Sequence, residues 1–368
     1  MTLPQTLTLR DLNRATLARQ LLLERSPLNV DAALERLVAL QAQLPSAPFV
    51  ALWSRIAGFE REQLTACLLD RSILKATSMR ATLHLLRADD HVRLRPTLAP
   101  LFDAALATIT KKRGALVDRA DLLAAARPFI DEAPRTFAEI SAMLSARWPD
   151  HDVGAMRYTV RTQLPLVQVP QAYGWGYPGN PTFALAETWI SRPIDAPPDP
   201  AALVRRYLVA FGPATVADIQ SWTGLANLKD VIAALADELV TLKDDRKRAL
   251  FDLPDSPRPD SATPAPVRFL PEFDNVLSGH KDRLRFIANE HRPKVYLPAL
   301  RVAPTILIDG FVAGVWKFES ARRSARLIVE PFGTITAQTR RELLAEGEPL
   351  AVFLDPVADA HRVEVVDR

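Results

Sequence analysis

The stretch that decides the fold is residues 199–253, DPAALVRRYLVAFGPATVADIQSWTGLANLKDVIAALADELVTLKDDRKRALFDL. A helix with regularly spaced apolar residues begins at Asp199 and is ended by Gly212 and the proline after it. A capping box at Thr215 begins a second helix, and a third helix follows within a few residues. Two short apolar strands around a charged turn complete the segment. Three short helices followed by a two-stranded hairpin predict a winged helix, a variant of the helix-turn-helix.

The same order of elements recurs in residues 114–195, which we predict to be a second winged-helix unit. A capping box at Thr136 begins its second helix, and its third helix occupies the position of a recognition helix. Arg157 and Arg161 lie four residues apart in that third helix, so they share one of its faces. Both arginines are therefore predicted DNA contacts.

The connection between the two strands of this unit is QAYGWGYPGNP at 171–181, which is rich in aromatic residues and glycine. One interpretation is a hairpin tip at which Tyr173 and Trp175 insert into the DNA minor groove. The other is a surface loop whose aromatic side chains pack back on the protein. The sequence leaves both interpretations open, and Tyr173 and Trp175 are candidate DNA contacts.

Residues 1–113 predict a further unit of the same kind, with more elaborate helices. Its predicted elements are helices at 13–25, 31–43 and 61–72, a strand at 76–86 and a longer helix at 89–112. The three units resemble one another in the order of their elements and hardly at all in their residues. The repeat is therefore one of architecture.

A proline-rich linker at 255–266 follows the third unit, residues 196–254, and marks a domain boundary. The remaining residues, 267–368, contain Asp309 and Gly310 between two apolar runs, which is a strong hairpin signal. Further predicted elements are strands at 325–333, 349–355 and 361–367 and one helix at 336–347. We therefore predict an α+β fold, with three tandem winged-helix units followed by a small C-terminal antiparallel β-barrel-like domain.

The composition excludes several classes of protein. Hydrophobic residues make up 48% and charged residues 24% of 368 residues, which indicates a folded protein of several domains. The apolar runs are short and interrupted, so we expect neither a membrane span nor a signal peptide, and a cytoplasmic protein. The single cysteine, Cys67, excludes an internal disulfide framework. The net charge of +3 supports nucleic-acid binding only weakly, and nothing demands more than a monomer.

Several widespread catalytic signatures are missing from the sequence. It contains no phosphate-binding G-x-x-x-x-G-K-[ST] loop, no H-E-x-x-H and no G-x-S-x-G nucleophile turn. The six histidines are scattered without the spacing of metal ligands. We therefore predict no metal and no cofactor.

Gln41 and Gln43 lie two residues apart in the segment LVALQAQLPS at 37–46. On a continuous helix their side chains would point about 200° apart. Pro45 disfavours helical geometry at Leu44, so we expect the chain to become extended here. In an extended chain, residues two apart face the same way, and both carboxamides can address one atom. A solvated helix end is the alternative that spacing alone leaves open.

A polar face is predicted for the strand SMRATLHL at 78–85. Strand alternation places Arg80 and His84 on that face, and apolar residues on the other. Such a face suits contact with phosphate groups or the wall of an active site, and a solvated outer face is the alternative. Arg80 and His84 are therefore candidate DNA contacts.

The segment LPEFDNVLSGHKDRLRF at 270–286 concentrates charged residues on an apolar framework. Glu272, Asp274 and Arg283 are among them. This density is what a DNA-facing or active-site loop needs, and it describes a salt-bridged surface turn equally well. Asp274 and Arg283 are candidate DNA contacts.

Five segments together give the chain a family resemblance: LNRATLARQLLLER, LVALQAQ, SMRATLHLL, LPEFDN and DGFVAGVWKF. In this order, and over nearly the whole chain, they resemble the bacterial AlkZ/YcaQ-like winged-helix DNA glycosylases, which unhook interstrand crosslinks. The resemblance implies three tandem winged helices and a β-barrel. It also implies a catalytic Gln-aliphatic-Gln motif, which Gln41 and Gln43 match, although the alanine between them is small for that position.

The activity that this resemblance implies is a monofunctional DNA glycosylase for N7-alkylated purines, in DNA repair or in self-resistance to a DNA-alkylating natural product. Gln41 and Gln43 would hold the hydrolytic water, since a carboxamide both accepts and donates hydrogen bonds. A glutamine is not a strong base, so the leaving group must already be activated, as a cationic N7-alkylguanine is. The expected partner is double-stranded DNA carrying alkylated purines or crosslinks. A non-catalytic winged-helix DNA-binding protein, either a regulator or a damage binder, is the alternative function.

Overall fold

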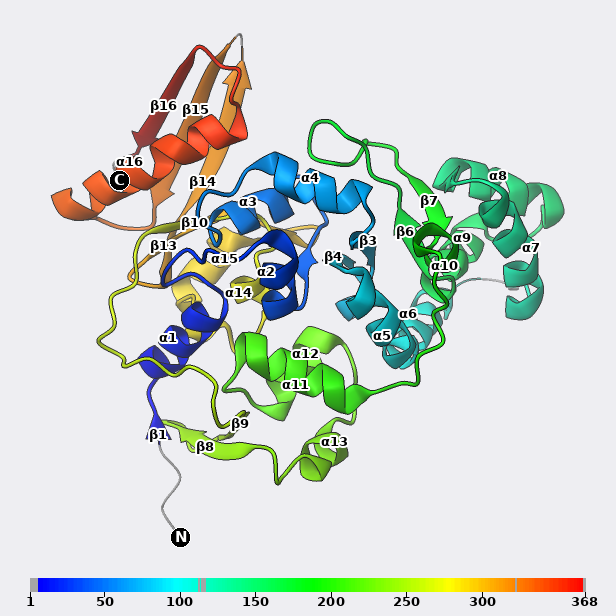
Figure 1. Ribbon diagram of the computed structural model, residues 1–368, viewed down its shortest axis with the longest axis horizontal. Coiled ribbons are helices and arrows are strands. Elements are labelled where there is room, and N and C mark those ends of the chain that lie inside the picture. The colour runs from blue at the N-terminus through cyan, green and yellow to red at the C-terminus, as the bar shows by residue number, and fades with distance from the viewer. Residues whose placement is uncertain (1–5, 112, 114–116, 322, 367–368) are drawn as a thin grey trace.

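The N-terminal part of the chain is mainly helical, with short strands between its helices (Figure 1). The computed structural model describes residues 6–111, 113, 117–321 and 323–366, so the predicted boundary after residue 113 adjoins residues outside the described part. The elements of this first part are β1 (Thr6–Leu7), α1 (Leu9–Arg19), α2 (Val30–Leu37), β2 (Leu40–Gln41), α3 (Ala47–Trp53), α4 (Arg61–Leu69), β3 (Ile73–Thr77), η1 (Met79–Ala81), β4 (Leu83–Arg87), α5 (Ala88–Thr97) and α6 (Ala99–Thr110).

Two predicted helices of this part differ from the structure. The helix expected at 31–43 ends at Leu37, because Val38 has a left-handed backbone conformation with φ of 69°. The chain then enters the short strand β2, as the proline that follows led us to expect. The helix expected at 89–112 is two helices that meet at Leu98, between two prolines that remove backbone hydrogen-bond donors.

The strand predicted at 76–86 is a hairpin. β3 and β4 pair in antiparallel orientation, and the short 3₁₀ turn η1 joins them. Arg80 and Ala81 both have positive φ, 55° and 56°, which reverses the direction of the chain. The alternation predicted for 78–85 is therefore wrong, and Arg80 and His84 lie on the turn and on β4 instead of on one strand face.

The second part contains the three helices and two strands that its sequence predicts, with further short elements. They are α7 (Arg119–Glu132), β5 (Arg135–Thr136), α8 (Phe137–Arg147), α9 (Val153–Gln163), β6 (Leu166–Gln168), β7 (Thr182–Leu185) and α10 (Ala186–Ile190). One sheet of order β2-β4-β3-β6-β7-β5 contains strands of both parts. Ala76 of β3 pairs with Val167 of β6 where the two parts meet. The first two predicted units therefore share a sheet.

The segment 199–253 contains the three helices and the hairpin that its sequence predicts. They are α11 (Pro200–Phe211), α12 (Val216–Thr223), α13 (Lys229–Ala234), β8 (Val240–Asp244) and β9 (Ala249–Asp252). The capping box at Thr215 begins α12, and Gly224 ends it in a left-handed conformation. α11 packs against α1 and α2 and buries Tyr207 and Phe211. β1 adds a parallel strand to the hairpin.

The C-terminal part consists of a five-stranded sheet and one long helix, preceded by several short helices. Its elements are β10 (Arg268–Leu270), α14 (Asn275–Ser278), η2 (Arg283–Arg285), η3 (Asn289–His291), α15 (Arg292–Val295), β11 (Tyr296–Leu297), β12 (Arg301–Val302), β13 (Thr305–Ile308), β14 (Phe311–Ala321), β15 (Ser324–Pro331), α16 (Ala337–Leu354) and β16 (Ala360–Val365).

This sheet is open, so the barrel-like closure expected from the sequence is not found among the described strands. Its order is β10-β13-β14-β15-β16, and the two edge strands β10 and β16 do not pair with each other. β15 and β16 are parallel, whereas the other three pairs are antiparallel. The Asp309 and Gly310 turn between β13 and β14 is confirmed.

The strand predicted at 349–355 belongs almost entirely to α16 instead. Leu343 and Leu350 are seven residues apart, two helical turns, and both are buried against the sheet. Gly347 brings the helix so close that a Cβ there would lie 2.9 Å from Cγ1 of Val363. Packing against the sheet therefore favours a helix in this segment.

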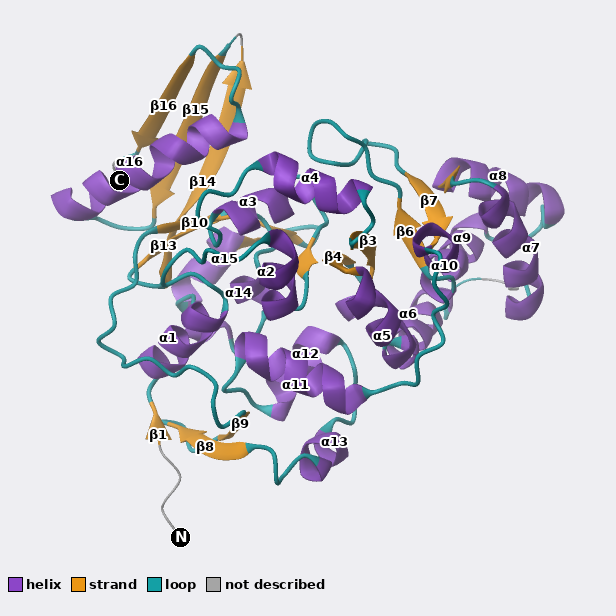
Figure 2. Cartoon of the chain, viewed as in Figure 1, coloured by secondary structure: helices purple, strands orange, loops and turns teal. Residues whose placement is uncertain are grey.

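The proline-rich segment 255–266 lies along α1 and contains neither helix nor strand. Nε of Arg14 donates to the carbonyl of Thr263 at 2.7 Å, and Nε of Arg19 donates to that of Pro257 at 3.2 Å. Figure 1 shows α7–α9 and the sheet with α16 at opposite ends of the molecule, with α11–α13 along one side. Figure 2 shows that long strands are confined to the C-terminal sheet. Throughout the described ranges, each helix is too short or too polar to cross a membrane.

Candidate active site

A cavity of about 670 Å³ collects side chains from the first, second and C-terminal parts of the chain. Both predicted catalytic glutamines line it, and we call it the glutamine cavity. Its lining consists of Gln41, Gln43, Leu44, Thr82, Arg161, Glu272, Phe273, Leu297 and residues 299–304. Residues that are distant in sequence are therefore brought together around Gln41 and Gln43.

Gln41 lies in the extended chain that the neighbouring proline predicts, and Gln43 follows it in an exposed bend. β2 pairs with β4 so that Gln41 is opposite His84, and N–H of Ala42 donates to the carbonyl of Leu83 at 2.8 Å. Ala42 is buried on the opposite side, at 1% exposure. A small middle residue fits here because it packs into the core behind the strand.

Arg80 lies beneath Gln41 and fixes its carboxamide. Nη2 of Arg80 donates to Oε1 of Gln41 at 2.9 Å, and Nη1 donates to the carbonyl of Trp222 at 2.8 Å. Gly224 has φ of 80°, and a Cβ there would lie 3.1 Å from the backbone nitrogen of Arg80, so a side chain at the end of α12 would be strained. The sequence predicts Arg80 as a phosphate contact, whereas both terminal nitrogens of its guanidinium already have partners within the protein.

His84 is buried behind Arg80 and is neutral. Its Nδ1 is 3.0 Å from the carbonyl of Thr82, which can only accept, so Nδ1 carries the proton. Nε2 then accepts from Nη2 of Arg80 at 3.4 Å. Burial, assisted by the charge of Arg80, lowers the pKa of His84 to about 3. The prediction of His84 as a DNA contact is therefore wrong, since the imidazole has neither the charge nor the exposure.

The LPEFDN segment is anchored to the strand of Gln41 from below. Asp274 forms a buried, bidentate ion pair with Arg55 at 2.8 Å, so its predicted role as a DNA contact is wrong. Nδ2 of Asn275 donates to the carbonyl of Ala39 at 2.8 Å, two residues before Gln41. These two contacts fix the position of the segment relative to β2.

Glu272 and Phe273 extend from this anchored segment into the glutamine cavity. Phe273 has φ of 62°, a conformation that is strained for a residue with a side chain. Burial raises the pKa of Glu272. Strained backbone and perturbed carboxyl groups concentrate at functional sites, because the surrounding structure must hold them in place.

The remaining predicted arginines are placed differently with respect to the cavity. Arg161 of α9 lines it, and burial lowers the pKa of its guanidinium. Arg157 is exposed one turn earlier on the same helix. Arg283 is half-buried, with its guanidinium 5.9 Å from the ring centre of Tyr296. Arg161 therefore belongs to the site, while Arg157 stands on the surface beside it.

The aromatic loop of the second part divides between the two interpretations that the sequence leaves open. Tyr173 is 73% exposed at the tip of the loop. Trp175 packs back on the protein, with its ring centre 5.4 Å from that of Phe49 and 3.8 Å from the guanidinium carbon of Arg61. Of the two residues, Tyr173 alone has the exposure that a DNA contact requires.

Sequence analysis did not identify the hairpin of β11 and β12 at the mouth of the cavity. Its turn residues Ala299 and Leu300 have φ of 59° and 58°, a conformation usually supplied by glycine or asparagine. Leu300 is 93% exposed at the tip. Since the residue types give no turn signal, the only indication in the sequence is the Pro298 that precedes them.

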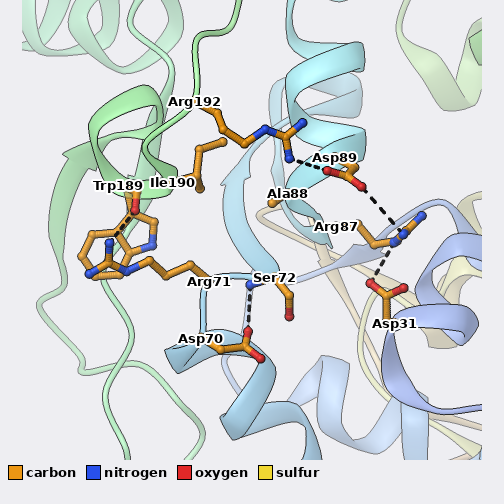
Figure 3. A pocket seen from close by; sticks show the side chains of 10 residues that line it. All are labelled: Asp31, Asp70, Arg71, Ser72, Arg87, Ala88, Asp89, Trp189, Ile190 and Arg192. Atoms are coloured by element: carbon orange, nitrogen blue, oxygen red, sulfur yellow. Dashed lines mark hydrogen bonds and ion pairs between the residues drawn. The ribbon is translucent and has the colours of Figure 1, made fainter.

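A second cavity, of about 330 Å³, is lined by charged side chains that pair with one another (Figure 3). Its internal contacts include the ion pairs Arg87–Asp31 and Arg192–Asp89 and the hydrogen bond from Arg71 to the carbonyl of Trp189. Because these groups satisfy one another, we assign the candidate chemistry to the glutamine cavity. Within the described ranges, histidine, cysteine and acidic side chains form no group that could hold a metal ion.

The chain is similar to known proteins over most of its length. A family model described as DNA glycosylase AlkZ-like matches residues 34–353. An interstrand DNA cross-link repair glycosylase of Streptomyces sahachiroi is 28% identical over 335 residues, covering 85% of this chain and 88% of that protein. The solved structure of the S. sahachiroi DNA glycosylase AlkZ matches with a TM-score of 0.81 and 22% identity, covering 98% of this chain and 100% of the other. At that identity, the structural match establishes the fold.

Proposed function

This chain belongs to the AlkZ-like DNA glycosylase family, and from that premise we propose that it hydrolyses the N-glycosidic bond of N7-alkylated purines in double-stranded DNA. The observation that carries the proposal is that Gln41, at the end of strand β2, and Gln43, two residues later, line one cavity. In a cell, this activity serves DNA repair or self-resistance to a DNA-alkylating natural product, in the compartment that holds the chromosome.

Gln41 and Gln43 hold the attacking water. Because Arg80 can only donate, its hydrogen bond identifies the group that faces it as Oε1 of Gln41. The amide NH₂ of Gln41 and the whole carboxamide of Gln43 then remain to orient a water molecule. Such positioning lowers the barrier because the water no longer has to lose its freedom during the reaction.

The leaving group determines the class of substrate. Hydrolysis at an anomeric carbon passes through an oxocarbenium-like state, and sugar hydrolases usually supply one carboxylic acid to protonate the leaving oxygen. An N7-alkylated purine is already cationic and departs as a neutral base, so it requires no acid. A pair of glutamines therefore suits alkylated purines better than normal bases or uracil.

Interstrand crosslinks are included in the proposed substrates. A base tied to the opposite strand cannot rotate fully into a closed pocket, as enzymes that act on single bases require. The name of the S. sahachiroi relative supports crosslinks as a substrate in this family. The glutamine cavity borders the exposed hairpin of β11 and β12, which leaves its mouth at the protein surface.

The reaction is hydrolysis without strand cleavage. Enzymes that also cut the strand form a Schiff base through an amine nucleophile. The described residues that line the glutamine cavity include no lysine. We therefore propose a monofunctional enzyme that works as a monomer and leaves an intact abasic site.

The test is release of N7-methylguanine from a duplex, run beside a duplex with an interstrand crosslink. We expect base release and an alkali-labile abasic site from the wild-type protein, and loss of release from the Gln41→Ala, Gln43→Ala double variant. Gln338→Ala is the matched control, because Gln338 is exposed on α16 and does not line the cavity. Binding of undamaged operator DNA without any base release would favour a non-catalytic DNA-binding protein.

A further inference from the structure

One carboxylate lines the glutamine cavity together with the two glutamines. Among the described lining residues, Glu272 alone is acidic, and Arg161 and Arg301 are the other charged residues. No described cation forms an ion pair with Glu272, although ion pairs are abundant elsewhere in the protein. Glu272 is therefore a free acid in the cavity that holds the water-binding glutamines.

The structure fixes Glu272 relative to Gln41 through the backbone on either side. Before it, Nε1 of Trp316 donates to the carbonyl of Leu270 at 2.9 Å and secures the end of β10. After it, Asn275 binds the carbonyl of Ala39, just before the strand of Gln41. The backbone on either side of Glu272 is thus held by hydrogen bonds, one of which joins it to the backbone just before Gln41, and such fixed positions are what catalytic groups require.

Among the described residues, Glu272 is an unpaired acid in a partly buried position. Burial raises the pKa of Glu272, since a carboxylate is less well solvated there than in water. A group with a raised pKa also becomes a better proton acceptor at neutral pH. Such acids are concentrated in active sites rather than in structural positions.

We infer that Glu272 is the catalytic base of the reaction and takes a proton from the water that Gln41 and Gln43 hold. This inference rests on the proposed function. The water oxygen bonds to C1′ while the bond from C1′ to N9 breaks. The electron pair of the breaking C1′–N9 bond moves onto the purine. The cationic purine leaves neutral, one water proton goes to the Glu272 carboxylate, and Glu272 later releases it to solvent.

A single carboxylate is sufficient for this reaction. Glycoside hydrolases need two, an acid for the leaving oxygen and a base or nucleophile for the other face. Because the alkylated purine needs no acid, only the second role remains. The presence of one acid among the described lining residues therefore matches a cationic leaving group.

The experiment is single-turnover release of N7-methylguanine between pH 5 and pH 8, with enzyme in excess. Four proteins are compared: wild type, Glu272→Gln, Gln41→Ala and Glu290→Gln. Glu290 is exposed on η3 of the same C-terminal part and does not line the cavity, so its variant is the matched loss of one negative charge. Thermal unfolding and DNA affinity are measured for each protein.

The titratable groups around the cavity make the pH profile interpretable. Arg161 of α9 and Arg301 of β12 line the cavity, and Arg80 hydrogen-bonds Gln41. Arginine side chains in general do not lose their proton in proteins. His84, behind Arg80, titrates near a pKa of about 3. Glu272 is then the protein group beside the water whose titration slows the reaction as the pH falls.

We expect Glu272→Gln to lower the rate at pH 7.5 by about a hundredfold, the lower range for a general base. The variant loses the acid limb of the profile, binds DNA at least as tightly and unfolds at the same or a higher temperature. Gln41→Ala is slower but keeps the acid limb, and Glu290→Gln matches wild type. A Glu272→Gln rate within about twofold of wild type, or an unchanged acid limb, overturns the inference. Absence of base release by the wild-type protein would instead overturn the proposed function.

Discussion

Arg80 donates a 2.9 Å hydrogen bond from Nη2 to Oε1 of Gln41, from a turn whose backbone has a left-handed conformation at Arg80 itself. Burial lowers the pKa of Arg80 to about 10, so the guanidinium stays charged at neutral pH. A charged donor on one side of a carboxamide polarises it and strengthens the NH₂ group on the other side as a donor. We therefore propose that Arg80 positions Gln41, in place of the phosphate contact expected from the sequence.

The coupling between these residues predicts how their variants combine. We expect Arg80→Met to slow base release by about ten- to a hundredfold, because a hydrogen bond to a charged group contributes about 1.5–3 kcal/mol. In a protein that already carries Gln41→Ala, the same change should cost much less, since the group it positions is gone. Single-turnover rates of the four proteins measure this coupling. Equal losses in both backgrounds would contradict the positioning role, and equal DNA affinity serves as the control.

The buried ion pair of Arg55 and Asp274 predicts a stability effect at a position that the sequence suggests for DNA binding. Asp274→Ala leaves the Arg55 guanidinium buried without a counter-charge, so we expect the free energy of unfolding to fall by about 3–5 kcal/mol. Asp103→Ala is the control, because Asp103 forms an exposed ion pair with Arg119 and such pairs contribute about 1 kcal/mol or less. Denaturant unfolding compares the two variants. A stable Asp274→Ala protein with weakened DNA binding would restore the surface role.

Tyr173 and Trp175 of the aromatic loop are expected to behave oppositely when each is replaced by alanine. Trp175→Ala removes the half-buried ring that packs on Phe49 and Arg61. We expect the free energy of unfolding to fall by about 2 kcal/mol. Tyr173→Ala should leave the unfolding temperature unchanged and weaken binding to duplex DNA. Thermal unfolding and a binding titration on both variants test the pair. Unchanged DNA affinity in Tyr173→Ala would remove the loop from the interface.

Three buried histidines predict loss of stability on mild acidification. Burial, the largest cause in each case, lowers the pKa of His84, His91 and His280 to about 3. The same groups in the unfolded chain titrate near about 6.5, so between these values the unfolded state binds more protons than the folded state. Stability is therefore fully present above about pH 6.5 and declines as the pH falls from there towards 3.

His91 is the residue on which to test this pH dependence. Its Nε2 has no hydrogen-bond partner among the described residues, so His91→Leu removes a titrating group without breaking a bond at that atom. We expect the unfolding temperature of the variant to fall less than that of wild type between pH 7 and pH 5. An identical loss in both proteins would show that other groups cause the acid sensitivity.

The regular elements of this fold were largely predictable because their signals are local. The three helices and the hairpin of 199–253 follow from caps, prolines and apolar spacing within the segment. The strand predicted at 349–355 failed for the opposite reason. Its apolar run is short enough to suit either element, and only the sheet beneath it, close to Gly347, selects a helix.

The candidate site was predictable only in part, since it depends on contacts between distant segments. Pro45 correctly indicated that the helix ends before Gln41 and that the chain is extended there, whereas Gln43 lies in a bend. By contrast, the turn at Arg80 requires two left-handed residues that carry no glycine signal, and it is supported by Gly224 of another unit. The sequence does not distinguish Glu272 from its charged neighbours. Within the described residues Asp274 is ion-paired and Glu272 is not, and this difference appears only in the folded structure.

The two arginines of α9 give a final prediction, because Arg157 is exposed at the surface and Arg161 lines the glutamine cavity. Arg157 is exposed, so Arg157→Ala should weaken binding to every duplex alike. It should also reduce the slope of log affinity against log salt by about 1, the value for one phosphate contact. Base release with enzyme in excess should remain unchanged.

Arg161→Ala should lower the rate of base release as well as the affinity, since Arg161 lines the glutamine cavity. Arg323→Ala is the control for both, because Arg323 pairs with Asp359 at the exposed turn of the C-terminal sheet, outside the cavity lining. Affinities measured at several salt concentrations and single-turnover rates separate the two arginines. A salt slope in Arg157→Ala equal to that of wild type would mean that this face of α9 does not contact the DNA backbone.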